Sequence, residues 1–201
     1  MTSMPAEPSR SVENQEQAPD TGASVVPQGT TWTLKQNLTR AMWMLFGRML
    51  FRCTFHNWYG VRRAILRAFG ARVGARAKIR PTVAIEIPWN LDIGEDCLIG
   101  DYSILYALGP ITIGARSVIS QYAHLCAGTH DYTSRVFQLL RPPIRVGSDC
   151  WIATDAYVAP GVTVGDRSVL GARSSVYKDM APDMIYVGNP AKPIRKREIV
   201  D

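Results

Sequence analysis

His130 is the side chain in this sequence best placed to move a proton. It lies in residues 128–143, a segment with Gly128, Pro142 and Pro143 that interrupts a regular repeat. Loops on rigid scaffolds commonly carry function, and an imidazole can accept a proton near neutral pH. His130 is therefore either a general base or an ordinary surface histidine, and the residue by itself favours neither interpretation.

The other two histidines are expected to have structural roles. His124 precedes Leu125, which is predicted to point inward, and His56 lies near the end of a predicted helix. A zinc enzyme of the γ-carbonic anhydrase kind needs three converging histidines. That site is not favoured, because only His124 and His130 lie in the repeat region, and we predict no metal.

Two carboxylates and one indole are further candidates for binding. Asp101 and Asp131 can accept hydrogen bonds from hydroxyl groups, and Asp131 can alternatively orient His130. Each is equally well explained as a solvated turn aspartate. Trp151 precedes an inward Ile152, so its ring is expected to face outward, toward a ligand or a neighbouring subunit.

The four cysteines have no CxxC spacing. Cys97 and Cys150 each fall two places before a repeated aliphatic position, where small buried residues are expected. Reduced packing residues in a cytoplasmic protein are the favoured interpretation. The first residues are polar and acidic, with no apolar run typical of a signal peptide, and no apolar run is long enough to span a membrane.

A six-residue repeat positions these side chains. From residue 146 to 176 an aliphatic residue recurs at every sixth position, usually followed by a small one: Val146, Ile152, Val158, Val164, Leu170 and Val176. This period is typical of a hexapeptide β-helix, a triangular coil of about 18 residues per turn. The aliphatic side chains are predicted to fill the interior, and the small residues to allow the backbone to turn the corners.

The repeat covers most of the chain. It begins at Val73, slips by two residues at Ile85–Ile87 and again at Ile111–Ile113, and stops for residues 128–143. We therefore predict a mainly β domain at 71–180 with a loop at 128–143. Residues 181–201, rich in proline and ending in basic residues, are predicted to be an irregular C-terminal extension.

The basic charge is confined to one segment. The 201 residues have a net charge of +6, but residues 30–80 hold eleven Lys or Arg and no acid, whereas residues 1–29 hold one Arg and four acids. Residues 1–29 are predicted to be a disordered tail. No recognition motif accompanies the basic segment, so nucleic acid is not a predicted partner.

Residues 30–70 are predicted to form a basic helical cap. The pattern favours helices at 34–55, capped by Thr33, and at 58–69. Leu38, Met42, Leu45 and Met49 form one apolar stripe. The helices either close the open end of the β-helix or lie on an anionic membrane surface. We favour the cap, and both roles are compatible.

Several motifs resemble a known family. Residues 151–155 (Trp-Ile-Ala-Thr-Asp), 159–165, 171–176 and 188–192 (Gly-Asn-Pro-Ala-Lys) are similar to the left-handed β-helix acyltransferases. Residues 79–81, 119–121 and 125–131, which include Gly-Thr-His-Asp, resemble the colanic acid biosynthesis acetyltransferase group more narrowly. That group is related to the maltose, galactoside and nodulation O-acetyltransferases.

The resemblance implies a fold, an activity and an assembly. It implies a left-handed parallel β-helix and a homotrimer with active sites between neighbouring prisms. Acetyl-CoA is the implied donor, and a sugar hydroxyl, in exopolysaccharide synthesis, is the implied acceptor. With Gly-Thr-His-Asp in register, a general-base role for His130 is favoured, and no metal is required.

The resemblance also assigns binding positions. It implies that Trp151 walls the acceptor pocket, although trimer packing is an equal alternative, and Asp101 and Asp131 remain candidate acceptor contacts because carboxylates bind sugar hydroxyls. Donor positions are Ala153 and Ala172, through their backbone groups, the hydroxyl of Thr154, and the cations Lys192 and Arg195 near the CoA phosphates. Tyr177 departs from the threonine of the galactoside enzymes, so no donor contact is assigned to it.

Two alternatives in function remain at this point. The same fold and base can acetylate a small xenobiotic instead of a glycan. The chain can also be a non-catalytic trimeric scaffold at a membrane. A lipid-linked glycan acceptor fits the acid-free segment, which predicts a cytoplasmic protein, peripheral at the inner face of the membrane.

Overall fold

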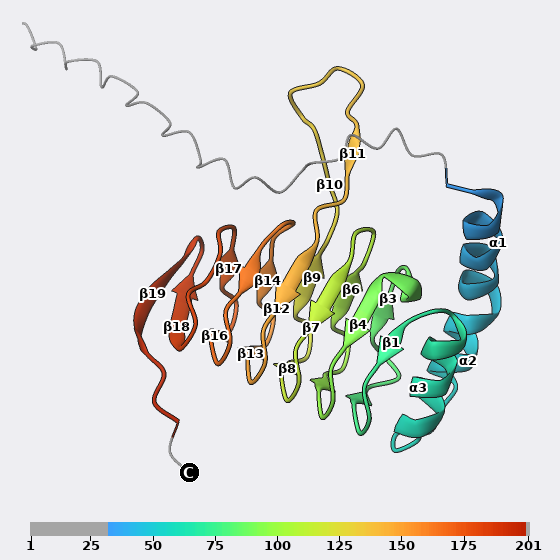
Figure 1. Cartoon of the computed structure of the whole chain (residues 1–201), viewed down its shortest axis with the longest axis horizontal. Helices are drawn as coiled ribbons and strands as arrows, with labels where there is room; N and C mark the ends of the chain where they lie inside the picture. Colours follow the sequence, from blue (N-terminus) through green and yellow to red (C-terminus); the bar gives the residue numbers. More distant parts are fainter. Residues whose placement is uncertain (1–31, 200–201) are drawn as a thin grey trace, which may run out of the picture.

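The computed structural model of the chain describes residues 32–199. They form a coil of short strands with helices at one end and a hairpin loop projecting from one side (Figure 1). This parallel β-helix is the predicted mainly β fold.

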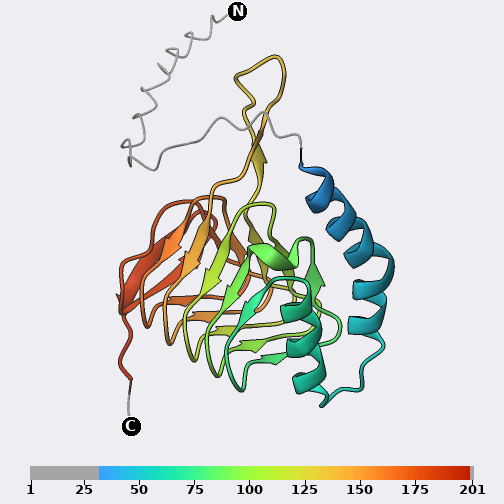
Figure 2. The ribbon, with the colours of Figure 1, turned by 45° about the vertical axis from the view of Figure 1, so that its right-hand side comes forward.

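Three parallel sheets make the sides of the coil (Figures 1 and 2). Sheet A contains β1 (Arg72–Val73), β4 (Leu91–Ile93), β7 (Ile111–Ile113), β12 (Ile144–Val146) and β15 (Thr163–Val164). Sheet B contains β2 (Lys78–Ile79), β5 (Leu98–Ile99), β8 (Val118–Ile119), β13 (Trp151–Ile152), β16 (Val169–Leu170), β18 (Met184–Gly188) and β19 (Ala191–Lys196). Sheet C contains β3 (Ala84–Ile85), β6 (Ile104–Tyr106), β9 (His124–Cys126), β14 (Tyr157–Val158) and β17 (Ser175–Val176).

The aliphatic repeat forms the core. In sheet B the inward residues stack in one fully buried column: Ile79, Ile99, Ile119, Ile152 and Leu170, each 0% exposed. Parallel pairing keeps this register, as in the pairing of Ile152 with Ile119 and Leu170. The predicted inward positions are confirmed, because each strand places one side chain inward and its neighbour outward.

The corners between sheets A and B carry a ladder of alternating charge. Left-handed backbone, with φ from 55° to 59°, recurs there at Arg76, Asp96, Arg116, Asp149, Arg167 and Asp183. Arginine and aspartate of successive turns pair at 2.6 Å for Arg76–Asp96, 2.6 Å for Arg116–Asp149 and 2.5 Å for Arg167–Asp183. Each pair bridges two turns of the coil at its surface.

The N-terminal helices differ in detail from the predicted ones. The first is divided into α1 (Leu34–Met42), a π-helical segment η1 (Trp43–Gly47) and α2 (Arg48–Arg52); the second is α3 (Tyr59–Ala68). Thr33 forms the predicted N-cap, with a capping box to Gln36. Among residues 32–199, no helix has the length and hydropathy required to cross a bilayer.

Arginines of α3 close the open end of the coil. Arg62 donates to the carbonyl oxygen of Ile79 at 2.5 Å, Arg63 to that of Ala77 at 2.9 Å, and Arg67 to that of Val73 at 3.0 Å. These guanidinium groups satisfy carbonyls of the first turn. The helix therefore protects an edge that is otherwise open to pairing with another chain.

The C-terminal segment is more regular than predicted. After Met180 the chain forms β18 and β19, an antiparallel pair that extends sheet B. The expectation of an irregular extension was wrong because Pro193 is tolerated in β19, the outermost strand of the sheet.

Candidate active site

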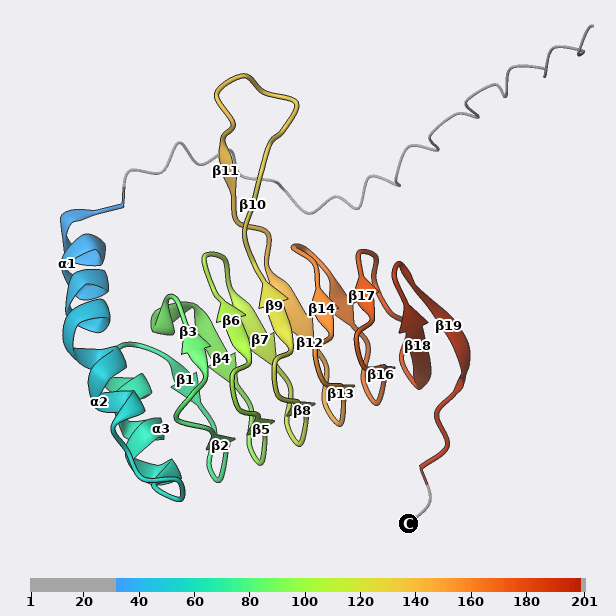
Figure 3. The same cartoon turned by 180° about the vertical axis from the view of Figure 1, so that it is seen from behind.

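The loop that carries His130 leaves the coil as a hairpin. β10 (Thr129–His130) pairs antiparallel with β11 (Leu139–Leu140), and the pairing joins His130 to Leu139. The hairpin projects from the corner between sheets C and A (Figure 3). At its base, a side chain on Gly128 would meet Leu108 at 2.9 Å, so the chain passes close to the preceding turn.

The ring of His130 is held by one residue of the loop. Its Nδ1 lies 2.8 Å from the carbonyl oxygen of Phe137, and the two rings stack at 4.4 Å with an interplanar angle of 10°. A carbonyl oxygen can only accept, so Nδ1 carries the hydrogen. This tautomer leaves Nε2 with a lone pair, and His130 is exposed. Nε2 is therefore the ring nitrogen left open to a ligand.

Asp131 shapes the turn next to His130. Its Oδ1 accepts hydrogen bonds from the Thr133 hydroxyl at 2.6 Å and the Thr133 backbone N–H at 3.0 Å. These bonds lower the pKa of the Asp131 carboxyl. The carboxylate is thus ionised, and its Oδ1 holds the turn, whereas the ring of His130 is oriented by Phe137.

Asp101 lies at a different corner of the coil, between sheets B and C. Its carboxylate accepts from Arg80 Nε and from the Thr82 hydroxyl, both at 2.7 Å. Burial raises the pKa of Asp101, but the hydrogen bonds from Thr82 and Arg80 outweigh burial and leave the pKa below its usual value. The carboxylate is therefore ionised at neutral pH.

Asp101 lines an open cleft of about 650 Å³ with two stacked tyrosines. The rings of Tyr102 and Tyr122 are 5.3 Å apart at 8°, and both are about half exposed, at 51% and 54%. Flat aromatic faces beside a carboxylate and Arg80 suit a polar ring such as a sugar. Both tyrosines occupy the third position after a buried isoleucine in successive turns, so the repeat register contained a signal for this pair.

Trp151 faces outward from sheet B, as predicted. It is 47% exposed, and its Nε1 donates to the Ser120 hydroxyl at 2.9 Å. A second hollow, of about 380 Å³, lies beside it and is lined by Arg116, Asp149 and Arg197 among others. The fixed indole offers a flat wall on this face.

The predicted donor residues lie on the C-terminal turns of the coil. Ala153 and Thr154 follow β13 at the corner between sheets B and C, and Ala172 occupies the corner of the next turn. The turns are joined by a hydrogen bond from the Arg173 N–H to the Thr154 carbonyl, at 2.9 Å. Lys192 and Arg195 are exposed on β19, at the outer edge of sheet B.

Within one chain, the residues of the His130 loop and those at the corner between sheets B and C lie apart. His130 and Asp131 project from the corner between sheets C and A, whereas Asp101, Thr154 and Ala172 lie at the corner between sheets B and C. One sheet of the triangular coil stands between those corners (Figure 2). The predicted residues therefore occupy two separate corners of the chain.

The remaining histidines lie among aromatic rings and arginines, and their structural roles stay predictions. His124 packs edge-on against Tyr106 and Tyr157, with ring centroids at 6.5 Å and 5.4 Å. Burial lowers the pKa of His124 and keeps its ring neutral. The backbone carbonyl of His56 accepts from Arg62 at 2.7 Å. Phe137, by contrast, is a site residue without any signal in the sequence, because its loop has no period.

Comparison with known proteins gives matches in two parts of the coil. The profile "Bacterial transferase hexapeptide (six repeats)" matches residues 143–178, and "Hexapeptide repeat of succinyl-transferase" matches residues 91–120. The chain is 47% identical over 156 residues to the Escherichia coli K12 protein named "Putative colanic acid biosynthesis acetyltransferase WcaF", covering 78% of this chain and 86% of that protein.

Solved structures share the fold. A maltose O-acetyltransferase from Clostridium difficile 630 is 26% identical, with a TM-score of 0.75 over 83% of this chain and 90% of the other. The hexapeptide-repeat acetyltransferase VCA0836 from Vibrio cholerae, in its complex with acetyl-CoA, is 24% identical, with a TM-score of 0.67 over 83% of this chain and 91% of the other.

Proposed function

Because the chain belongs to the hexapeptide-repeat acetyltransferase family, we propose that it transfers an acetyl group from acetyl-CoA to a sugar hydroxyl, with His130 as the general base. The observation that carries the proposal is the contact of His130 Nδ1 with the Phe137 carbonyl, which leaves Nε2 available to accept a proton. The 47% identity to a protein named "Putative colanic acid biosynthesis acetyltransferase WcaF" favours a glycan acceptor.

A single base is sufficient for both proton transfers of the reaction. Nε2 of His130 takes the hydroxyl proton while the sugar oxygen attacks the thioester carbonyl carbon. The resulting tetrahedral intermediate collapses, the C–S bond breaks, and the CoA sulfur leaves as a thiolate. The imidazolium returns its proton to that sulfur, so the base is restored and the products are an acetyl ester and CoA.

A homotrimer with sites between neighbouring coils is part of the proposal. The separation of His130 from the donor corner supports it, since a three-fold arrangement can bring the loop corner of one chain to the corner of the next. In such a site Asp101, Asp131 and Trp151 contact the acceptor. Flat tyrosine faces beside Asp101 support a sugar there.

The acetyl-CoA donor is proposed to lie along the C-terminal turns of the coil. Backbone groups of Ala153 and Ala172 and the hydroxyl of Thr154 hold the pantetheine arm, since small side chains let a ligand approach the backbone. Exposed Lys192 and Arg195 on β19 provide cations for the CoA phosphates.

An acceptor panel tests the proposal. Acetyl-CoA is offered with nucleotide sugars, lipid-linked oligosaccharides and chloramphenicol, and thiol release is followed. We expect release that depends on a glycan, with a loss of about 10²–10⁴-fold in His130→Ala. Val136→Ala, on the same loop and 80% exposed in the parent residue, is the matched control.

Three results would count against it. Preference for chloramphenicol would indicate a xenobiotic acetyltransferase with the same base. Unchanged turnover in His130→Ala would remove the general base, and no acceptor-dependent release at all would favour a non-catalytic scaffold.

A further inference from the structure

The apolar stripe of the first helical segment faces away from the coil. Five side chains at helical spacing, here called the apolar stripe, are 44–85% exposed: Leu34, Leu38, Met42, Leu45 and Met49. The buried face of the same segment contains Trp43, Gly47 and Phe51. In Figures 1 and 3 one long side of α1 and α2 is not covered by any strand of the coil.

Contacts on the buried face fix this orientation. Trp43 Nε1 donates to the carbonyl oxygen of Ile85 at 3.0 Å, and its ring packs edge-on against Phe69 at 5.1 Å. Arg40 forms an ion pair with Glu86 at 2.6 Å. The helix therefore cannot rotate its apolar stripe inward without breaking these contacts.

An exposed apolar stripe of this kind indicates a binding surface. An amphipathic helix of a globular protein normally turns its apolar face to the core, and a large exposed apolar patch marks an interaction site. In α1 no residue is buried. The patch continues beyond the stripe through Phe46, Leu50, Phe55 and Trp58, which are 51–69% exposed.

Charge around the apolar stripe selects the occupant. Lys35 and Arg52 are exposed and Arg48 is partly exposed, and residues 30–80 contain no acid. The arginines of α3 differ, because they donate to backbone carbonyls of the first turn. A second copy of this helix would bring like charges together, whereas an anionic lipid surface complements both the charge and the apolar side chains.

We propose that the apolar stripe binds the surface of an anionic lipid bilayer, with α1 and α2 lying parallel to it. Leucine, methionine and phenylalanine side chains enter the acyl boundary, Trp58 lies at headgroup depth, and Lys35, Arg48 and Arg52 contact lipid phosphates. The α3 helix closes the coil, so the two helical parts have separate roles. This inference does not depend on the proposed chemistry.

Vesicle co-sedimentation of the full chain tests the proposal. Vesicles are made of phosphatidylcholine with or without phosphatidylglycerol. We expect binding that increases with phosphatidylglycerol and falls with added salt. Leu38→Glu is expected to lower the partition coefficient about tenfold or more, because it removes a leucine from the acyl boundary and adds a repelled charge.

Gln36→Glu is the matched control. It adds the same charge to the same helix on the face away from the apolar stripe, and glutamate preserves the capping box with Thr33. We expect it to keep most of the binding. Thermal unfolding verifies that each variant is folded, and Leu38→Ser replaces Leu38→Glu if the latter melts early.

Two outcomes overturn the proposal. In one, the unmodified protein does not bind phosphatidylglycerol vesicles at low salt, or Leu38→Glu binds as well as Gln36→Glu. In the other, light scattering shows that Leu38→Glu or Leu38→Ser reduces the size of the assembly while vesicle binding is absent, which identifies a second copy of the chain as the occupant.

Discussion

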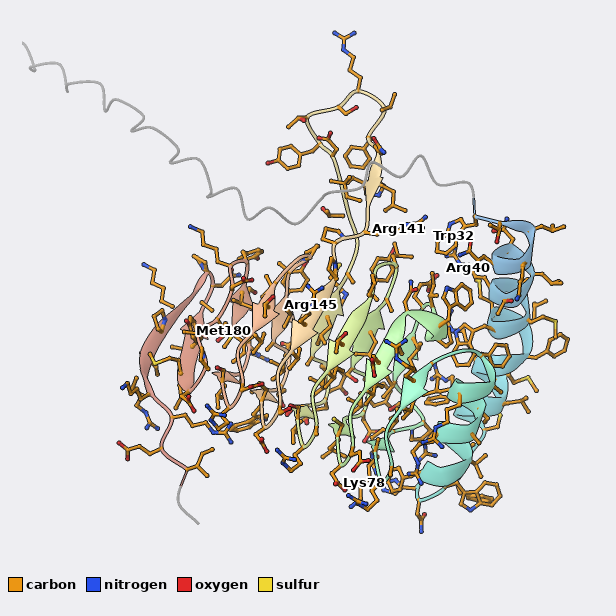
Figure 4. The ribbon with its side chains drawn as sticks, viewed as in Figure 1. Trp32, Arg40, Lys78, Arg141, Arg145 and Met180 are labelled. Atoms are coloured by element: carbon orange, nitrogen blue, oxygen red, sulfur yellow. The ribbon has the colours of Figure 1, made fainter. Side chains whose placement is uncertain are left out.

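The guanidinium group of Arg141 lies over the indole ring of Trp32, 4.0 Å from the ring centroid. Arg40 of α1 approaches the same ring at 5.6 Å. Figure 4 shows the three residues together where the loop leaves the coil and α1 begins. The base of the hairpin that carries His130 is thus attached to the start of the helical segment, more than a hundred residues earlier in the chain.

Removal of this contact is expected to loosen the hairpin. Cation–π contacts contribute about 0.5–2 kcal/mol, so Trp32→Ala should increase the rate of proteolytic cleavage within residues 131–138 several-fold. Trp58→Ala is the control, because Trp58 packs against Phe55 and not against the loop. Equal cleavage rates in both variants would show that the hairpin is held by its own strands.

Phe137→Ala is expected to reduce kcat roughly tenfold, because the imidazole loses the ring that aligns it. The KM for acetyl-CoA should stay unchanged, since the donor residues lie at another corner. Phe137→Tyr retains the stacked ring and should retain activity. Initial-rate kinetics with both substrates varied distinguish this positioning effect from a general loss of fold, which would change all parameters in both variants.

Lys192→Gln and Arg195→Gln are expected to raise the KM for acetyl-CoA about tenfold each, because a charge-assisted hydrogen bond to phosphate is lost. The value of kcat at saturating donor should be preserved. Lys35→Gln, at the opposite end of the coil, is the matched control in kinetic assays. A fall in kcat without a change in KM would mean that these residues do not bind the donor.

Arg62→Met is expected to lower the free energy of unfolding by about 3 kcal/mol or more, because it leaves several buried acceptors without a hydrogen-bond donor. Arg62 is 0% exposed and donates to four acceptors at 2.5–2.8 Å: the carbonyls of Ile79, Phe55 and His56 and the Thr54 hydroxyl. Arg72→Met breaks an exposed pair with Asp92 and should cost less than about 1 kcal/mol. Urea unfolding measures both, and equal losses would contradict the capping role of Arg62.

The charge ladder predicts a dependence of stability on pH. Hydrogen bonds from Arg76, Arg116 and Arg167 lower the pKa values of Asp96, Asp149 and Asp183. A carboxyl group whose pKa is lowered on folding stabilises the fold at pH values above its unfolded pKa of about 4. This stabilisation is lost as the pH falls through the pKa of the folded state. The urea concentration at the midpoint of unfolding should therefore decrease as the pH is lowered below about 4. The decrease should be smaller in the triple variant Asp96→Asn, Asp149→Asn, Asp183→Asn. Parallel pH profiles would contradict this.

Burial periodicity made the coil predictable. A strand presents alternate residues to the interior, so one aliphatic residue in six is enough to predict the inward column. The first slip of the repeat has a local cause that the pattern did not contain. Between Ile85 and Leu91 the chain makes a 3₁₀ turn, η2 (Pro88–Asn90), and the Asn90 side chain donates to the carbonyls of Ala107 and Leu108 at 2.9 Å.

The direction of the apolar stripe and the tautomer of His130 depend on side-chain contacts that periodicity does not reveal. The pattern of α1 marked the apolar stripe but not the direction in which it points, which follows from the bond of Trp43 to Ile85 and its packing on Phe69. Similarly, His130 could be identified by its motif, whereas the carbonyl that sets its tautomer comes from Phe137, seven residues away in a loop without a repeat.

The hairpin with His130 interrupts the coil without disturbing it. Ile111 still pairs with Ile144, and Ile113 with Val146, as if residues 128–143 were not there. The coil can therefore accept an insertion at this corner without a change in the register of its sheets.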